Sequence, residues 1–294
     1  MIQKSIKVFL KGMYMALLEG GGFLKHGWLK YGFLQIFNTI IFGVAYIFFR
    51  MKLPYNQAYN QSQQAAGVLF KRLVPQIALK YQGRQLKIQP EYSDLNCLSV
   101  LKEVFVDDIY DIENQICSGM TVLDIGANIG FYSLAAACLL DQGKVIAFEP
   151  LPENYKILTS NIKKNNFKNI TPESCALYKE SGAMNLLTGS SMGPTLQINS
   201  KQIGDSILVQ VLTLDEFCFR HGLSSVDVIK IDTEGVELEI LQGAENILKN
   251  SRSLRLAIAS YHYDNEVEKI SMFLKERNFE VKVTDKKIIH AIKH

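Results

Sequence analysis

The stretch that decides the fold is Val122-Leu-Asp-Ile-Gly-Ala-Asn-Ile-Gly-Phe-Tyr132. A short apolar run ends at Asp124, Gly126 and Gly130 bracket a tight turn, and small residues follow up to Ala137. This order is typical of a β-strand, a glycine-rich loop and a helix whose amino terminus faces a nucleotide-like ligand. The sequence therefore predicts an α/β fold with a ligand at this loop.

Apolar strands alternate with amphipathic helices after this loop. We predict strands at 144–149, 170–177, 184–187, 208–212, 226–232 and 254–260, helices at 153–164, 237–249 and 266–277, and a closing hairpin at 279–284 and 287–292. Such alternation predicts a parallel sheet with helices on both faces. The antiparallel hairpin at the end indicates a Rossmann-like fold of the methyltransferase type.

Three acids lie where strands of this sheet end, which is where a ligand binds in such folds. Asp124 can orient the glycine loop and contact a cationic amino group, while Gly126 and Gly130 let the backbone approach the ligand. Glu149 ends the second strand and can accept hydrogen bonds from both ribose hydroxyls. Asp232 ends a central strand that we expect to lie next to the first.

A nicotinamide enzyme is the main alternative, and its Gly-x-Gly-x-x-Gly motif leaves room for a pyrophosphate. Counted from Gly126, the second and third glycine positions are Asn128 and Phe131. A pyrophosphate would meet side chains there, whereas an adenosine ligand with an amino-acid tail carries no phosphate. The loop therefore favours S-adenosylmethionine over NAD.

The second informative stretch runs from Val226 to Ala244 and contains Ile-Asp-Thr-Glu-Gly-Val-Glu. It places Asp232 and Glu234 in the turn between a strand and a helix, at the mouth where a methyl group would be transferred. Glu237 and Glu239 at the start of the helix are explained as well by favourable electrostatics at a helix amino terminus.

These motifs together resemble the FkbM family of S-adenosylmethionine-dependent methyltransferases. The resemblance rests on 122–130, on Phe148-Glu-Pro150, on Thr213-Leu-Asp-Glu-Phe217 and on 229–244, and it spans about residues 78–285. It implies a seven-stranded class I methyltransferase fold. It also implies O-methylation of a hydroxyl on a sugar, glycan or natural-product-like acceptor.

The resemblance implies a role for each matching residue. Asp124, Gly126, Asn128 and Gly130 would hold the methionine part and the turn, Glu149 the ribose, and the strand around Ala176 would lie near the adenine. Asp232 and Glu234 would line the acceptor side. One departure is Ala259-Ser-Tyr-His262, where such proteins often have an acid, and it leaves His262 as the only well-placed imidazole.

An alcohol acceptor benefits from a base that removes its proton as the new bond forms. We expect His262 to be that base, with Asp232 second, since histidine titrates near neutral pH. No metal site is predicted. Asp232, Glu234 and His262 could also hold a divalent cation, but their spacing matches no recognised metal motif.

Residues 1–75 differ from the rest of the chain and are interpreted as a hydrophobic helical extension with a linker. Residues 31–49 carry no charge and approach the length of a membrane span, yet the preceding lysines would orient the following domain away from the cytoplasm. We expect a cytoplasmic enzyme whose residues 23–50 either contact the cytoplasmic face of a membrane or pack in the protein or a homodimer.

We further expect a hairpin and a helix at 76–118 as a cover, followed by the methyltransferase domain at 119–294. The formal charge of +3 over 294 residues gives no sign of a nucleic-acid binder. Five cysteines without a Cys-x-x-Cys pair indicate a reducing compartment. Besides the O-methyltransferase, two alternatives remain. They are a noncatalytic S-adenosylmethionine-binding protein and an NAD-dependent oxidoreductase.

Overall fold

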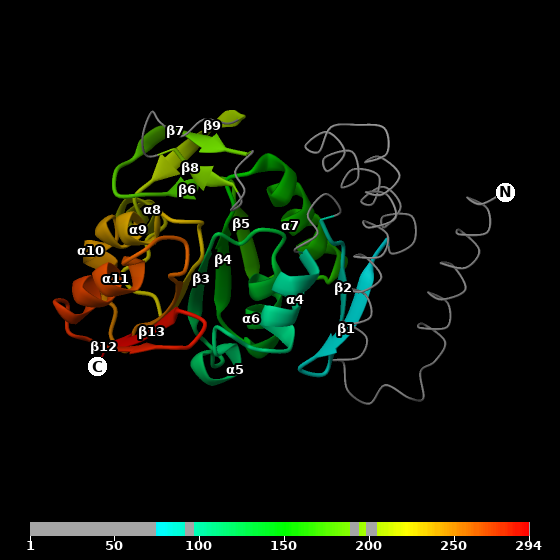
Figure 1. Ribbon diagram of the computed structural model, residues 1–294. Coiled ribbons are helices and arrows are strands. Elements are labelled where there is room, and N and C mark those ends of the chain that lie inside the picture. The colour runs from blue at the N-terminus through cyan, green and yellow to red at the C-terminus, as the bar shows by residue number, and fades with distance from the viewer. Residues whose placement is uncertain (1–74, 92–96, 189–193, 198–204, 294) are drawn as a thin grey trace. The chain divides into compact units, whose positions relative to one another are not determined.

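The computed structural model describes residues 75–91, 97–188, 194–197 and 205–293 (Figure 1). Its main sheet has seven strands in the order β12-β13-β11-β10-β3-β4-β5. Their bounds are β3 Thr121–Ile125, β4 Lys144–Phe148, β5 Ile170–Glu173, β10 Val228–Ile231, β11 Arg255–Ala259, β12 Phe279–Val283 and β13 Ile288–Lys293. Strands β5, β4, β3, β10 and β11 are parallel, and β13 and β12 are antiparallel. The predicted sheet and its closing hairpin are confirmed.

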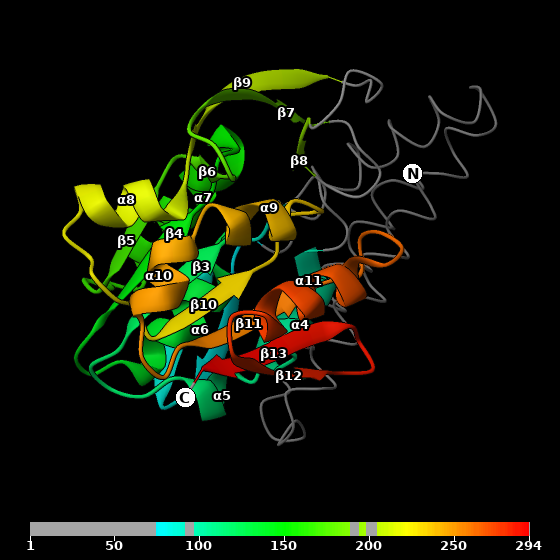
Figure 2. The same cartoon turned by 90° about the vertical axis from the view of Figure 1, so that its left-hand side faces the viewer.

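Helices cover both faces of this sheet, as Figures 1 and 2 show. One face carries α6 (Phe131–Leu139) and α7 (Pro152–Lys164). The other face carries α8 (Leu214–Arg220), α9 (Glu237–Gln242), α10 (Glu245–Asn250) and α11 (Glu266–Lys275). Because both faces are covered, all residues of β10 and four of the five in β11 are buried.

The single strand predicted at 170–177 is wrong, because the chain leaves the main sheet after Glu173. The reason is that, among the described strands, β5 pairs only with β4. Strand β4 ends at Phe148, and Pro150, which follows, has no amide hydrogen to extend the ladder. A second sheet of four strands instead has the order β6-β9-β7-β8. Its strands are β6 Ala176–Leu177, β7 Gly182–Leu187, β8 Thr195–Leu196 and β9 Ser206–Leu212.

The continuous helix predicted at 237–249 is also wrong, because it breaks between α9 and α10. Gly243 caps α9, and a Cβ atom there would lie 2.3 Å from the backbone oxygen of Tyr178. The new helix start is held by Asp215, whose carboxylate accepts hydrogen bonds from the amides of Asn246 (2.8 Å) and Ile247 (2.9 Å). Close packing and a side-chain cap thus restart the helix.

The predicted hairpin and helix before the main sheet are confirmed as β1 (Ile77–Tyr81), β2 (Arg84–Ile88) and α4 (Cys97–Phe105). A short helix, α5 (Ile112–Gln115), follows them. The described residues fall into two compact units, one with 75–79 and 87–107 and the other with 80–86 and 108–293. All site residues discussed below belong to the second unit.

The predicted N-terminal extension, including the proposed contact at 23–50, lies outside the described residues, as does most of the excursion at 188–193. Within the described ranges, no helix combines the length and the apolar character needed to cross a bilayer. The predicted domain boundaries at 75/76 and 118/119 stay predictions.

Candidate active site

The glycine loop between β3 and α6 packs its backbone against the end of β10. A Cβ atom on Gly126, whose φ is +77°, would lie 1.9 Å from the backbone oxygen of Asp232. Gly130 has a φ of +96° and precedes the first residue of α6. These two glycines are therefore required by backbone conformation and by close approach. The same contact brings the predicted cofactor loop next to the predicted acceptor side.

Asp124 and Lys230 form a buried ion pair beneath this loop. They are direct neighbours across β3 and β10, and Asp124 Oδ1 lies 3.1 Å from Lys230 Nζ. Asp124 is fully buried, Lys230 is 4% exposed, and Ser133 Oγ donates to Asp124 Oδ2 at 2.5 Å. Lys230 Nζ also donates to the backbone oxygen of Gly126 at 2.7 Å. This pair thus orients the loop, and the contact of Asp124 with the cofactor's amino group stays a prediction.

Glu149 follows β4 and joins the loop to the neighbouring strand. Its Oε2 accepts from the amide of Asn128 at 2.8 Å, and its Oε1 accepts from the amide of Leu151 at 2.9 Å. Burial raises the pKa of Glu149 to about 7, against the lowering effect of those two hydrogen bonds. Each oxygen keeps a lone pair, so the carboxylate could accept from two hydroxyls, and its contact with a ribose stays a prediction.

Asp232, Glu234 and His262 are brought together at the ends of β10 and β11, as the sequence predicts for the acceptor side. His262 Nδ1 lies 3.1 Å from Glu234 Oε2, and its Nε2 lies 3.5 Å from Asp232 Oδ1. Tyr110 Oη donates to Asp232 Oδ2 at 2.7 Å. Tyr110 is 122 positions away in the sequence, and no motif pointed to it.

The environment of these groups differs from that of a free histidine base. Burial lowers the pKa of His262, but the adjacent carboxylates of Asp232, Glu234 and Glu237 raise it to about 10. Burial raises the pKa of Asp232, but the adjacent imidazole of His262, the charge of Lys230 and the hydrogen bond from Tyr110 bring it to about 2. Without a further cation, His262 is therefore an imidazolium among carboxylates at neutral pH.

Solvent reaches the carboxylates of this group more readily than the imidazole. The side chain of Glu234 is 33% exposed, that of Asp232 is 21% exposed, and that of His262 is only 2% exposed. If this is the acceptor side, as predicted, an acceptor that enters from solvent would meet Asp232 and Glu234 first. This geometry favours a positioning role for His262, whose predicted role as first base stays untested.

Glu237 does more than favour the amino terminus of α9. It is fully buried, and its Oε1 accepts from the Thr233 amide (2.8 Å), the Thr233 hydroxyl (3.0 Å) and the Gly235 amide (3.2 Å). Burial, followed by the charge of Glu237, raises the pKa of neighbouring Glu266 to about 7. Glu237 thus fixes the turn that carries Glu234.

Ala176, predicted to lie near the adenine, is buried in β6. Its place at the start of the second sheet follows directly from the break after Glu173. Its contact with the cofactor stays a prediction.

Comparison with known proteins decides the family. The model of the FkbM methyltransferase domain matches residues 124–281, which is more than half of the chain. This chain belongs to the FkbM methyltransferase family. It is a methyltransferase, and S-adenosylmethionine is the cofactor of its family. The predicted enzyme class and cofactor are confirmed, and the oxidoreductase alternative is excluded.

The similar proteins include other methyltransferases. Methyltransferase sdnD of Sordaria araneosa is 28% identical over 184 residues, covering 52% of this chain and 71% of that protein. The hexuronic acid methyltransferase AglP of Haloferax volcanii is 26% identical over 163 residues, covering 55% of this chain and 64% of that protein. The 31-O-demethyl-FK506 methyltransferase FkbM of Streptomyces tacrolimicus is 23% identical over 212 residues, covering 61% of this chain and 80% of that protein.

Solved methyltransferases are also similar to this FkbM-family chain. Precorrin-6y C5,15-methyltransferase from Geobacter metallireducens has a TM-score of 0.42 and 17% sequence identity. The match covers 64% of this chain and 87% of that structure.

Proposed function

We propose that this methyltransferase transfers a methyl group to a hydroxyl of a sugar, glycan or natural-product-like acceptor. The observation that carries the proposal is the group of Asp232, Glu234 and His262 beside the glycine loop. A hydroxyl is a weak nucleophile that benefits from a nearby proton acceptor as the bond forms. Carboxylates at the acceptor side supply one.

The relatives support an oxygen acceptor. The names of two of them refer to a hexuronic acid and to the 31-O-demethyl form of FK506. A sugar acid and a natural product both present hydroxyls on a ring or a chain.

The residues of this chain divide the work between alignment and proton removal. When bound, S-adenosylmethionine supplies an already activated methyl group, so the protein mainly aligns donor and acceptor. Glu149 would hold the ribose, and Gly126 and Gly130 shape the loop. The bound cofactor would supply the methyl group to the acceptor oxygen, and Asp232 or Glu234 would accept the proton of the acceptor hydroxyl. His262 positions both carboxylates.

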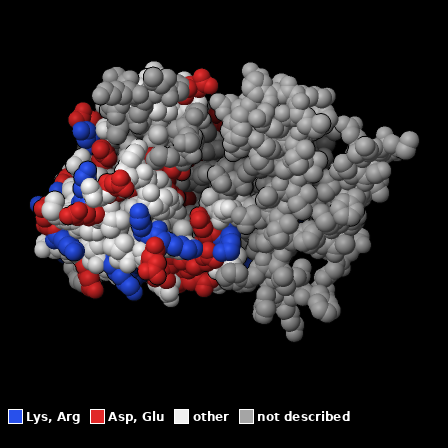
Figure 3. Space-filling model, in the orientation of Figure 1, with Lys and Arg blue, Asp and Glu red and all other residues white. Residues whose placement is uncertain are grey.

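The turn after β10 argues against methylation of amino groups on nucleic-acid bases. That chemistry uses an Asn/Asp-Pro-Pro-Tyr turn, whereas this chain has Asp232-Thr-Glu-Gly235. On the face shown in Figure 3, basic and acidic side chains are interspersed over the described residues. That face therefore differs from the continuous basic surface expected for nucleic-acid binding.

The test is a screen of uronic acid glycosides, neutral glycosides and polyketide alcohols with S-adenosylmethionine, measured as release of S-adenosylhomocysteine. We expect turnover with a hydroxyl-bearing compound, and we expect Asp232→Asn to lose it. Asp227→Asn is the matched control and should keep turnover, because Asp227 lies at the opposite end of β10 and contacts the Thr121 amide. Turnover with amines only would contradict the proposal.

We also propose a cytoplasmic location with the segment 23–50 contacting a membrane or a second copy of the chain. The support is the uncharged run at 31–49 and the lysines before it. Fractionation and sedimentation of the full chain separate the two partners. A chain that is monomeric and soluble without detergent contradicts both.

A further inference from the structure

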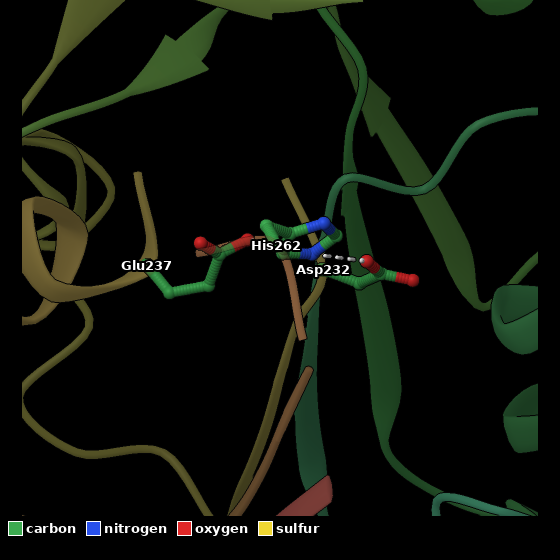
Figure 4. A group of neighbouring side chains, drawn as sticks. All are labelled: Asp232, Glu237 and His262. Carbon is green, nitrogen blue, oxygen red and sulfur yellow. Dashed lines mark ion pairs between the residues drawn. The ribbon is translucent and has the colours of Figure 1, made fainter. Parts of the chain in front are cut away.

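We propose that Asp232, Glu237 and His262 bind a divalent first-row transition cation on the acceptor side of the site. One ligand atom from each of them lies within 4.8 Å of the others. Asp232 follows β10, Glu237 begins α9 and His262 follows β11. Figure 4 shows the imidazole ring between the two carboxylates. The site goes beyond the proposed function, which by itself needs no metal.

The spacing around His262 Nε2 fits ligands of one cation better than it fits hydrogen bonds. Nε2 lies 3.5 Å from Asp232 Oδ1 and 3.6 Å from Glu237 Oε1. Charge-assisted N–H···O bonds are about 2.7–2.9 Å long. Tetrahedral ligand atoms with metal bonds of about 2.0–2.2 Å are about 3.3–3.6 Å apart. Among the described residues, Nε2 has no hydrogen-bond partner, although only 2% of the side chain is exposed.

The other ring nitrogen is placed as it is in metal-binding histidines. Nδ1 lies 3.1 Å from Glu234 Oε2, so the Nδ1 hydrogen is donated to this carboxylate. A histidine that donates one N–H to a carboxylate presents the lone pair of its other nitrogen to a metal. Glu234 is thereby a positioning residue for His262.

The two carboxylates are also supported from outside. Tyr110 holds Oδ2 of Asp232, which leaves Oδ1 towards the imidazole. Backbone and hydroxyl donors of Thr233 and Gly235 hold Oε1 of fully buried Glu237. Oε2 of Glu237 is buried and has no hydrogen-bond partner among the described residues, so it is the oxygen of this carboxylate that is open to a cation. A buried carboxylate oxygen without a donor is costly unless a cation compensates it.

The donor set indicates which cation fits. One imidazole nitrogen with two carboxylate oxygens suits Mn²⁺ or Zn²⁺, whereas Mg²⁺ and Ca²⁺ prefer oxygen ligands alone. A cation there would lower the pKa of an acceptor hydroxyl and stabilise its oxygen as the proton leaves. This catalytic part rests on the proposed O-methyl transfer, while the binding of the cation does not.

The test is a titration of EDTA-treated full-length protein with MnCl₂ alone. Binding is measured as the loss of the free Mn²⁺ signal in electron paramagnetic resonance. We expect one saturable site per chain, with ZnCl₂ as a competitor. Asp232→Asn and Glu237→Gln should each weaken binding at least about tenfold, the loss typical of an altered metal shell. Glu239→Gln on the same helix and exposed His221→Gln are matched controls that should bind as the wild type does.

Binding of S-adenosylhomocysteine to each variant reports whether it is folded. If Glu237→Gln does not fold, Asp232→Asn alone decides, because its side chain is partly exposed. Absence of saturable Mn²⁺ and Zn²⁺ binding, or unchanged binding in Asp232→Asn, overturns the inference. Full methyl transfer in excess EDTA overturns its catalytic part and leaves the proposed function intact. Metal binding without any transfer to hydroxyls leaves the inferred metal site intact and contradicts the proposed function.

Discussion

Replacing Lys230 with methionine tests the buried pair that supports the glycine loop. The change keeps most of the side-chain volume but leaves the carboxylate of Asp124, which is fully buried, without its cation. Breaking a buried pair by removing one partner costs about 3–5 kcal/mol of stability. The loop carbonyl of Gly126 also loses its 2.7 Å donor, which adds about 1 kcal/mol. We expect the free energy of unfolding to fall by about 4–6 kcal/mol.

The assay is urea unfolding of the wild type, Lys230→Met, Asp124→Asn and the double variant, which form a double-mutant cycle. Because each single change leaves a buried polar group unpaired, the double variant should be more stable than additivity predicts, by about 2–3 kcal/mol. Lys144→Met at the exposed start of β4 is the matched control and should change stability little. Additive effects, or a loss below about 1 kcal/mol for Lys230→Met, would refute the reasoning.

Three further predictions concern the loop and its neighbours. Because the pKa of Glu149 is raised to about 7 from 4.5, the ligand-free protein should lose stability in melting curves as the pH rises from 4.5 to about 7. The affinity for S-adenosylhomocysteine, measured by calorimetry, should fall about tenfold per pH unit below pH 7. Glu149→Gln should show neither trend. Gly126→Ala should abolish S-adenosylhomocysteine binding, because the new Cβ would lie 1.9 Å from the Asp232 backbone oxygen. Gly83 has a φ of +76° and no described atom within 4 Å of a Cβ, so Gly83→Ala should cost only about 1–2 kcal/mol in urea unfolding. Tyr110→Phe removes a 2.7 Å hydrogen bond to Asp232 and should lower the free energy of unfolding by about 1.5–3 kcal/mol, and an unchanged urea midpoint would contradict that contact.

Strand and helix alternation was enough to predict the main sheet, because its strands are apolar and of regular length. The neighbourhood of Asp124 and Asp232 also followed from the sequence, since both end parallel strands at one edge. The second sheet did not follow, because β6 and β8 have only two residues each. Strands that short show no periodicity to recognise.

The parts of the site that sequence reasoning missed depend on contacts across the fold. Lys230 interrupts an otherwise apolar strand, which was the available signal, but its role depends on lying directly opposite Asp124 in the sheet register. Tyr110 reaches Asp232 from a different segment. Glu237 was assigned to helix electrostatics because a sequence does not reveal that its carboxylate is fully buried.

The central claim is that this FkbM-family enzyme places a methyl group on an oxygen at the mouth formed by the glycine loop and Asp232. The most direct measurement uses S-adenosylmethionine with a deuterated methyl group and locates the label in the product by mass spectrometry and NMR. The account predicts the label on a hydroxyl oxygen, with transfer lost in Asp232→Asn and retained in Asp227→Asn. A label on nitrogen or carbon, or full transfer by Asp232→Asn, would contradict it.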